Sequence, residues 1–169
     1  MSRGFVKEDD LEHAGTDVPE RPISAHPNYV TANGYAQLKA LEAELEQKRT
    51  ALGANRDAVG TQQQLAVINR DLRYITARLE SALVVKPTVT TPDASANQVL
   101  FGATVSVEDE NGDRHSYEIV GEDEADIHAN KVSWTSPLAK ALIGHKVGES
   151  VIWQRPAGNV NLEIIAITC

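Results

Sequence analysis

An apolar heptad pattern in the first half of the chain favours helices that pack side by side. Leucine, isoleucine and alanine recur there in alternating steps of three and four, at Leu65, Ile68, Leu72, Ile75, Leu79 and Ala82. A less regular apolar stripe precedes them, at Tyr35, Leu38, Leu41, Leu45 and Leu52, and Thr31 is placed to cap its helix. Residues 53–60 read as a turn. We therefore expect helices over about 32–54 and 62–84, forming an antiparallel coiled-coil hairpin within residues 31–85. Helices that pack on a globular core are the alternative.

The last seventy residues predict a small α+β domain. Alternating apolar residues from Val99 to Val107 indicate a half-buried strand, and Asn111-Gly112 is a strong hairpin signal before a return strand over about 114–120. Val132 and Trp134 suggest a short third strand. Ser136 and Pro137 predict the start of a short helix, and a final hairpin follows. The expected fold is a mostly antiparallel sheet with one short helix over residues 98–169.

The remaining segments lack such patterns. Residues 1–30 contain three prolines, mixed charges and few large apolar side chains, which predicts a mobile N-terminal arm. Residues 86–97 read as a linker.

Composition limits the location and the partners. The chain has no apolar run long enough to span a membrane, no apolar region of a signal peptide, and a single cysteine, Cys169, so we expect a cytoplasmic protein. The net charge is −8. Residues 86–169 hold 6 basic and 12 acidic residues, which argues against independent binding to duplex DNA but is compatible with a basic protein partner.

Several segments together resemble the bacterial Gre transcript-cleavage factors, the GreA/GreB family. In the C-terminal half these are Phe101-Gly102-Ala103-Thr104-Val105, residues 117–126, residues 136–144 and Lys146-Val147-Gly148-Glu149. In the hairpin they are Tyr29-Val30-Thr31 followed by Gly34-Tyr35, and Arg73-Tyr74-Ile75-Thr76. The resemblance implies an FKBP-like fold for the C-terminal domain, and bacterial RNA polymerase as the partner.

The hairpin tip departs from this family. Gre factors carry a Gly-Asp-x-Ser-Glu-Asn type motif there, whose two acids help to hold a catalytic magnesium in the polymerase. This chain has nothing like that motif: its tip candidates are Arg56 and Asp57, and Asp57 is the only acid between Glu46 and Asp71. One carboxylate cannot replace a pair, because magnesium takes several oxygen ligands in octahedral geometry. The hairpin is also shorter, by about 10 Å of helix in each arm. We therefore expect no transcript-cleavage activity, no catalytic residues, no metal and no cofactor.

The resemblance also points to a contact with the polymerase. Thr135, Ser136 and Pro137 match a loop of the family's C-terminal domain that contacts the rim of the secondary channel, although GreB has an acid at the position of Thr135. Helix capping alone would also explain Ser136-Pro137. The expected function is a polymerase-binding regulator of elongation that meets nascent RNA or DNA only within the polymerase complex and does not bind membranes.

Other interpretations stay open at this point. The chain also resembles the Rnk regulator, a protein-interaction module, and an FKBP-like fold could carry prolyl isomerase activity if it had an aromatic pocket. Basic side chains of the hairpin could face RNA or polymerase, but a solvated surface is the simpler interpretation. The acids Glu122, Asp123, Glu124 and Asp126 fit no calcium loop and read as a solvated turn.

Overall fold

The computed structural model describes residues 18–55, 57–86 and 97–168, and these divide into two units. The first unit contains the N-terminal segment as far as His26 together with residues 37–81. The second unit contains residues 27–36 and the chain from Ala82 onward. Each unit is described in turn.

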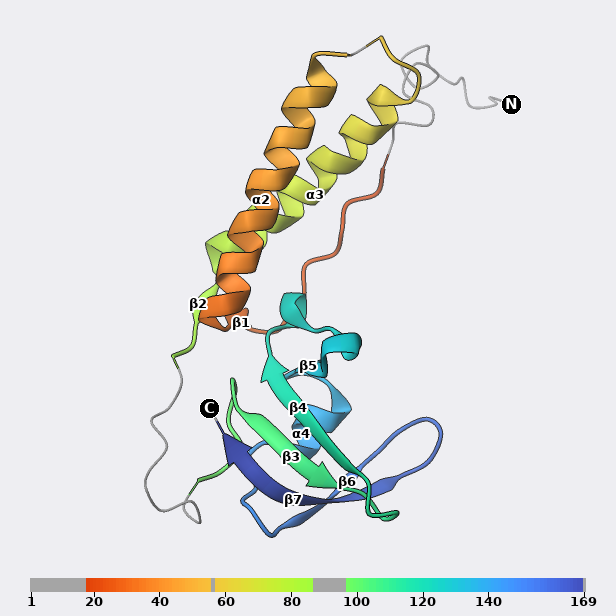
Figure 1. Cartoon of the computed structure of the whole chain (residues 1–169). Helices are drawn as coiled ribbons and strands as arrows, with labels where there is room; N and C mark the ends of the chain where they lie inside the picture. Colours follow the sequence, from red (N-terminus) through yellow and green to blue (C-terminus); the bar gives the residue numbers. More distant parts are fainter. Residues whose placement is uncertain (1–17, 56, 87–96, 169) are drawn as a thin grey trace, which may run out of the picture. The chain divides into compact units, whose positions relative to one another are not determined.

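Two long helices lie side by side in the first unit and run in opposite directions (Figure 1). They are α2, Ala32–Gly53, and α3, Thr61–Ser81. Their shared core consists of Leu38 and Leu45 of α2 and of Ile68, Leu72 and Ile75 of α3. Leu52 and Leu79 pack against this core. The predicted hairpin and its apolar seam are therefore confirmed.

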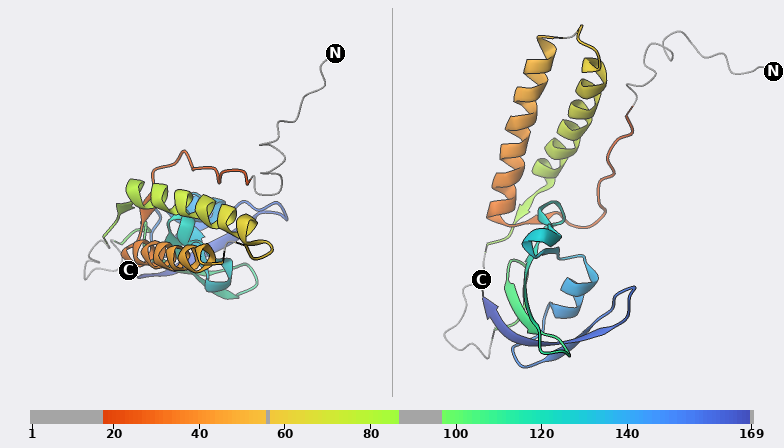
Figure 2. Two further views of the ribbon diagram at one scale, coloured as in Figure 1. Left: turned by 90° about the horizontal axis from the view of Figure 1, so that it is seen from above. Right: turned by 45° about the vertical axis from the view of Figure 1, so that its right-hand side comes forward.

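The described part of the N-terminal segment runs alongside α3 (Figures 1 and 2). The Arg73 guanidinium donates to both carboxylate oxygens of Glu20, and its Nε lies 3.0 and 3.1 Å from them. The guanidinium of Arg21 lies 3.8 Å from the centre of the Tyr74 ring and 3.4 Å from the Asp71 carboxylate. Residues 1–17 of the predicted mobile arm lie outside the described residues. Within residues 18–30, Glu20 and Arg21 contact α3 and Tyr29–Val30 form a short strand, while the mobility of the arm stays a prediction.

The Glu20–Arg73 contact predicts a pH dependence. The bond from Arg73 holds the pKa of Glu20 below its usual value. The contact therefore stabilises the folded arm above the ordinary carboxyl pKa and is lost as the pH falls through the lowered one. We expect an NMR titration of Glu20 to give this low pKa, and Arg73→Gln to return it toward the ordinary value. Lys39→Gln, on the other helix, should leave it unchanged. A Glu20 pKa that ignores Arg73→Gln would show that the pair does not form in solution.

A short pair of parallel strands flanks the helical hairpin in the sequence. β1, Tyr29–Val30, pairs with β2, Leu83–Val84, with Tyr29 opposite Leu83 and Val30 opposite Val84. Val30 is fully buried. β1 leads directly into α2, whose first turn is capped by Thr31: its hydroxyl accepts from the Gly34 amide at 3.0 Å. The entry and the exit of the hairpin are thus hydrogen-bonded to each other.

The second unit is built on a curled five-stranded sheet in the order β5-β4-β3-β7-β6. The strands are β3 (Thr104–Glu108), β4 (Arg114–Val120), β5 (Lys131–Ser133), β6 (Ser150–Trp153) and β7 (Val160–Thr168). Helix α4, Pro137–Leu142, packs on the sheet through Leu138, Ala139 and Leu142. Its partners include Val105, Val107, Ile119 and Ile164. The α+β fold is therefore confirmed.

Two details of the sheet add to the sequence prediction. β5 pairs with β4 in parallel, whereas the other three strand pairs are antiparallel, as expected of a mostly antiparallel sheet. Two short 3-10 helices, η2 (Glu122–Glu124) and η3 (Ile127–Ala129), carry the chain between these strands and make the parallel return possible. The first strand also starts later than expected, because Gly102 has φ of +87° and breaks the extended run. Val99 bonds instead to His145 and Gly144.

The turn at Asn111-Gly112 joins β3 to β4 as predicted. Gly112 has φ of +82°, and its amide bonds to the Asp109 carbonyl at 3.0 Å. None of the helices described is long and apolar enough to cross a membrane.

Candidate functional site

The hairpin tip is a tight turn between Gly53 and Thr61. Amides of Asn55, Ala58 and Thr61 bond back to carbonyls three residues earlier, at 3.0 to 3.2 Å. Asp57 is exposed in this turn, and Val59 beside it is fully exposed. Arg56, the other tip candidate, lies outside the described residues. Among the described residues no group of three or more His, Cys, Asp or Glu side chains is placed to hold a metal ion.

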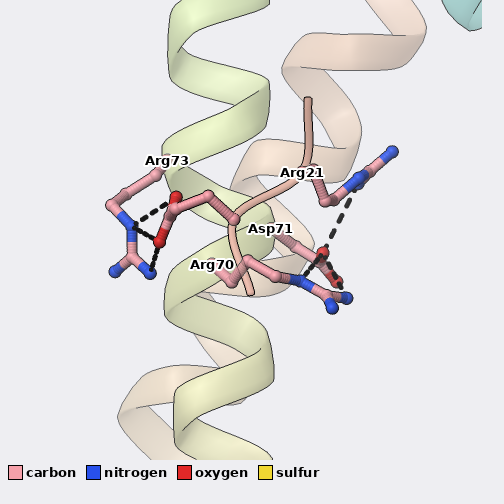
Figure 3. Close-up of polar contacts among 5 residues, drawn as sticks. Arg21, Arg70, Asp71 and Arg73 are labelled. Atoms are coloured by element: carbon pink, nitrogen blue, oxygen red, sulfur yellow. Dashed lines mark hydrogen bonds and ion pairs between the residues drawn. The ribbon is translucent and has the colours of Figure 1, made fainter. Parts of the chain in front are cut away.

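Three basic side chains of the hairpin, Lys48, Arg70 and Arg73, are paired with acids. Arg70 donates to Asp71 at 3.0 and 3.1 Å, and Figure 3 shows Arg21 meeting the same carboxylate from the N-terminal segment. Arg73 holds Glu20, and Lys48 lies 3.0 Å from Glu44 one turn away. Exposed pairs of this kind contribute little stability. They do reduce the free positive charge that α3 presents, which agrees with a solvated rather than a nucleic-acid-binding face.

The predicted contact loop, residues 135–137, starts α4 in the second unit. The Ser136 hydroxyl accepts from the Ala139 amide at 3.2 Å and so caps the helix, while Pro137 occupies its first turn and is exposed. The Thr135 hydroxyl lies 2.7 Å from that of Ser133, and the Thr135 amide bonds to the same Ser133 hydroxyl. These bonds fix the path of the backbone through the loop and leave one edge of it open to solvent.

Aromatic rings support the residue before this loop. The Trp134 ring lies edge-on to Tyr29, with ring centres 5.1 Å apart, and Tyr29 also contacts Phe101 at 6.0 Å. Tyr29 belongs to β1, so the segment that enters α2 and the segment that enters α4 share one aromatic cluster. The loop is thereby held by packing as well as by hydrogen bonds.

The structure reveals one buried acid that sequence reasoning placed in solvent. Glu124 of η2 is only 6% exposed. Its carboxylate accepts from the Thr31 amide at 2.9 Å, from the Thr31 hydroxyl, and from the Gly121 amide at 3.1 Å. The interpretation of residues 122–126 as a solvated acidic turn is therefore wrong for Glu124. A negative charge at the first turn of α2 is also favoured by the helix dipole.

Two glycines make room for this carboxylate. A Cβ on Gly34 would lie 1.9 Å from Glu124 Cδ, far inside any permitted contact. A Cβ on Gly121 would lie 2.3 Å from the backbone oxygen of Tyr29. Thr31, Gly34, Gly121 and Glu124 thus form one interlocked group, which we call the Glu124 clasp. Its members are up to 93 residues apart in sequence, so spacing alone could not identify it.

The tip candidates and the loop candidates belong to different units. Asp57 lies in the helical unit, and Thr135, Ser136 and Pro137 lie in the sheet unit. The two groups are therefore separate candidate surfaces rather than one constellation.

Comparison with known proteins places the chain among transcription factors. Residues 94–169 match the family described as "Transcription elongation factor, GreA/GreB, C-term". Transcription elongation factor GreB of Neisseria meningitidis serogroup B is 34% identical over 154 residues, covering 83% of this chain and 93% of the relative. Transcription elongation factor GreA of Thioalkalivibrio sulfidiphilus is 39% identical over 117 residues, covering 69% of this chain and 72% of the relative.

Comparison with solved structures gives weaker similarities. The structure of the transcription factor Gfh1 has a TM-score of 0.42 at 23% identity, covering 86% of this chain and all of that one. A GreA/GreB factor from Nitrosomonas europaea has a TM-score of 0.40 at 22% identity, covering 84% and 99%.

Proposed function

This chain belongs to the GreA/GreB family of transcription elongation factors, and we propose that it binds bacterial RNA polymerase at the secondary channel without supplying the acids needed for transcript cleavage. In this proposal the C-terminal domain docks at the channel rim and the short hairpin enters the channel. The protein meets RNA or DNA only inside the polymerase complex. It would accordingly act in the cytoplasm.

The tip carries this proposal. The family's tip acids are absent, and Asp57 is the only carboxylate in the sequence between Glu46 and Asp71. Magnesium binds through several oxygen ligands in near-octahedral geometry, and a lone exposed carboxylate supplies at most two of them. The protein would therefore occupy the channel and exclude an active Gre factor while adding no chemistry.

The loop at residues 135–137 supports the docking part of the proposal. It is capped, packed against the aromatic cluster and open to solvent at Pro137. Such a preorganised loop loses little conformational entropy when it binds a partner. We propose Thr135, Ser136 and Pro137 as contact residues.

Three measurements with purified bacterial RNA polymerase test this function. We expect the full-length protein to bind the polymerase, to leave the RNA of backtracked complexes uncleaved in the presence of magnesium, and to reduce cleavage by an added GreB factor. RNA cleavage comparable to that of GreB would disprove the inactive tip. No affinity for the polymerase would reject the channel proposal and favour the protein-interaction module that the Rnk resemblance suggested.

Binding and folding roles of the loop can be separated by variants that keep the cap. Ser136→Asp retains a capping acceptor, and Pro137→Ala retains a good helix former at the first position. We expect the double variant to keep its melting temperature but to bind polymerase about tenfold more weakly, a loss of roughly 1.4 kcal/mol. Asp57→Ala, the matched tip control, should change the affinity less than about twofold. Unchanged affinity in the loop variant would remove these residues from the interface.

A further inference from the structure

The curled sheet has two edge strands, and only one of them carries residues that discourage pairing with another chain. In the described part of the chain, the order β5-β4-β3-β7-β6 leaves β5 and β6 with one neighbouring strand each. β5 is three residues long and begins with Lys131, and a short edge and a lysine both protect against a further strand. β6, Ser150–Trp153, contains neither a charge nor a proline, and its Ile152 is 56% exposed. The edge of β6 is therefore the unprotected one.

A hydrogen bond of the neighbouring strand shows that the backbone of Ile152 faces this open edge. Ile152 lies opposite Asn161 of β7. The Asn161 amide donates to the Glu110 carboxylate at 3.2 Å and so points away from β6. In an antiparallel ladder, two opposite residues either exchange both backbone hydrogen bonds or exchange none. Ile152 and Asn161 are thus a non-bonded pair, and the amide and carbonyl of Ile152 point outward.

A second hydrogen bond gives the same alternation along the strand. At the start of β6 the Ile164 amide donates to the Glu149 carbonyl at 3.0 Å, so this pair is a bonded one. Bonded and non-bonded pairs alternate from there. The even-numbered residues from Ser150 to Gln154 therefore present their amide and carbonyl groups to the open edge.

Side chains of opposite charge flank β6. Glu149 stands directly before the strand and Arg155 two residues after it. The guanidinium of Arg155 lies 5.2 Å from the centre of the Trp153 ring and has no acidic partner among the described residues. Glu149 accepts from the Lys146 amide through Oε2, which also lies 3.7 Å from His145 Nδ1. Its Oε1 has no partner in the described part of the chain and is open to a cation.

A second copy of β6 matches this edge. Two copies related by a two-fold axis pair in antiparallel, and outward-facing residues must lie opposite one another to bond. When Ile152 lies opposite Ile152 of the second copy, Ser150 lies opposite Gln154. In the same register Glu149 lies opposite Arg155, so that opposite charges meet at both ends of the paired strands.

Neighbouring registers lose one of these matches. Moving the axis one residue onward, to Trp153, would place Ser150 opposite Pro156, which has no amide hydrogen to donate. Moving it one residue back would place Glu149 opposite Trp153 and remove the charge pair. The register centred on Ile152 is therefore the favoured one.

We propose that the edge of β6 is a self-association surface, at which two copies of this chain join their five-stranded sheets across a two-fold axis at Ile152. The two Ile152 side chains cover each other on the exposed face of the strands. The flanking charges at 149 and 155 fix the antiparallel direction. The inference concerns the C-terminal domain, goes beyond the polymerase proposal and does not depend on it.

Disulfide trapping in the full-length protein tests the register. In a Cys169→Ser background, Ile152→Cys places two thiols opposite one another, with a Cα separation of about 5.5 Å that a disulfide can bridge. Ser150→Cys is the matched control, because its two copies would lie four residues apart along the strands, about 13 Å. We expect the Ile152→Cys protein to form disulfide-linked dimers at least about tenfold faster than the Ser150→Cys protein. Mixing Ser150→Cys with Gln154→Cys should restore fast crosslinking.

Charge variants test the two-fold axis without cysteines. Because residue 152 faces itself, Ile152→Lys and Ile152→Glu each bring like charges together, whereas a mixture of the two brings opposite charges together. We expect each variant alone to associate at least about tenfold more weakly than the unchanged protein, and the mixture to recover. Ile127→Lys, at an isoleucine that is 82% exposed on η3, should leave association unchanged. Sedimentation at physiological salt measures all four, because salt screens the repulsion between copies of net charge −8 beyond about 8 Å.

Other patterns overturn the proposal. An unchanged protein that sediments as a monomer up to about 1 mM has no such surface. Equal crosslinking rates for Ile152→Cys and Ser150→Cys would reject the register. Dimers that persist in both charge variants would lie at another surface. Circular dichroism confirms for every variant that the sheet remains formed.

Discussion

Leu72→Asp is expected to unfold the helical hairpin. Leu72 is 7% exposed and lies in the core shared by α2 and α3, with Leu45, Ile68 and Ile75 in the same cluster. The substitution removes buried apolar area and places either an unpaired carboxylate or a protonated carboxyl group in the seam. We expect the free energy of unfolding of the hairpin to fall by about 4 kcal/mol or more, which is most of the stability of a small domain.

Leu41→Asp provides the matched control. It makes the same chemical change on α2, at a leucine that is 40% exposed. We expect a loss below about 1 kcal/mol there, as is usual for surface positions. Far-ultraviolet circular dichroism during urea unfolding measures both variants. Equal stabilities for Leu72→Asp and the unchanged protein would mean that the seam does not hold the helices together.

Gly34→Ala is expected to destabilise the sheet unit, against the usual trend for glycine in a helix. Alanine normally gains about 0.5–1 kcal/mol over glycine within a helix. Here the new Cβ would lie 1.9 Å from Glu124 Cδ and would expel the carboxylate from the clasp. The amides of Thr31 and Gly121 would then lose their acceptor. Because buried unsatisfied donors cost about 1–3 kcal/mol each, we expect a net loss of about 3 kcal/mol.

The second half of this prediction is that the effect of Gly34→Ala on stability changes sign when Glu124 is also replaced. Glu124→Ala alone should also cost about 3 kcal/mol, for the same lost hydrogen bonds. In that background the obstructing side chain is gone, so Gly34→Ala should become neutral or stabilising. Chemical denaturation of the two single variants and the double variant completes the cycle. Additive losses would show that Gly34 and Glu124 do not interact in solution.

The elements with local patterns were predictable from sequence. The heptad spacing identified both helices and most of their buried residues, because a helix places every third or fourth side chain on one face. It overestimated two positions. Leu41 lies about 60° around α2 from Leu38, at the edge of the stripe, and is partly exposed. Leu65, at the start of the seam, is only half-buried. The cap by Ser136 followed from local chemistry in the same way.

The features that sequence reasoning missed depend on distant contacts. Glu124 stands in a run of acids that looks solvated, and only the approach of Thr31 and Gly34 makes it a buried acceptor. The parallel pairing of β5 requires η2 and η3, and no short sequence motif predicted these two helices. The pairing of Glu20 with Arg73 joins two segments that each look polar and independent. The turn between the two long helices and the start of α4 lie where the sequence predicted them, while the site roles of the tip and loop residues stay predictions.

The parallel pairing of β1 with β2 allows the length of the hairpin to change without a change in the strands at its base. The chain enters and leaves the helical excursion at one fixed pair of strands, Tyr29 opposite Leu83 and Val30 opposite Val84. Residues can therefore be added to or removed from both helices without changing that junction. The apolar seam repeats every seven residues, so a matched change of one repeat in each helix keeps every remaining layer in register. Each such step moves the tip by about 10 Å. Evolution can therefore change the distance from this junction to the tip in steps of one heptad per helix.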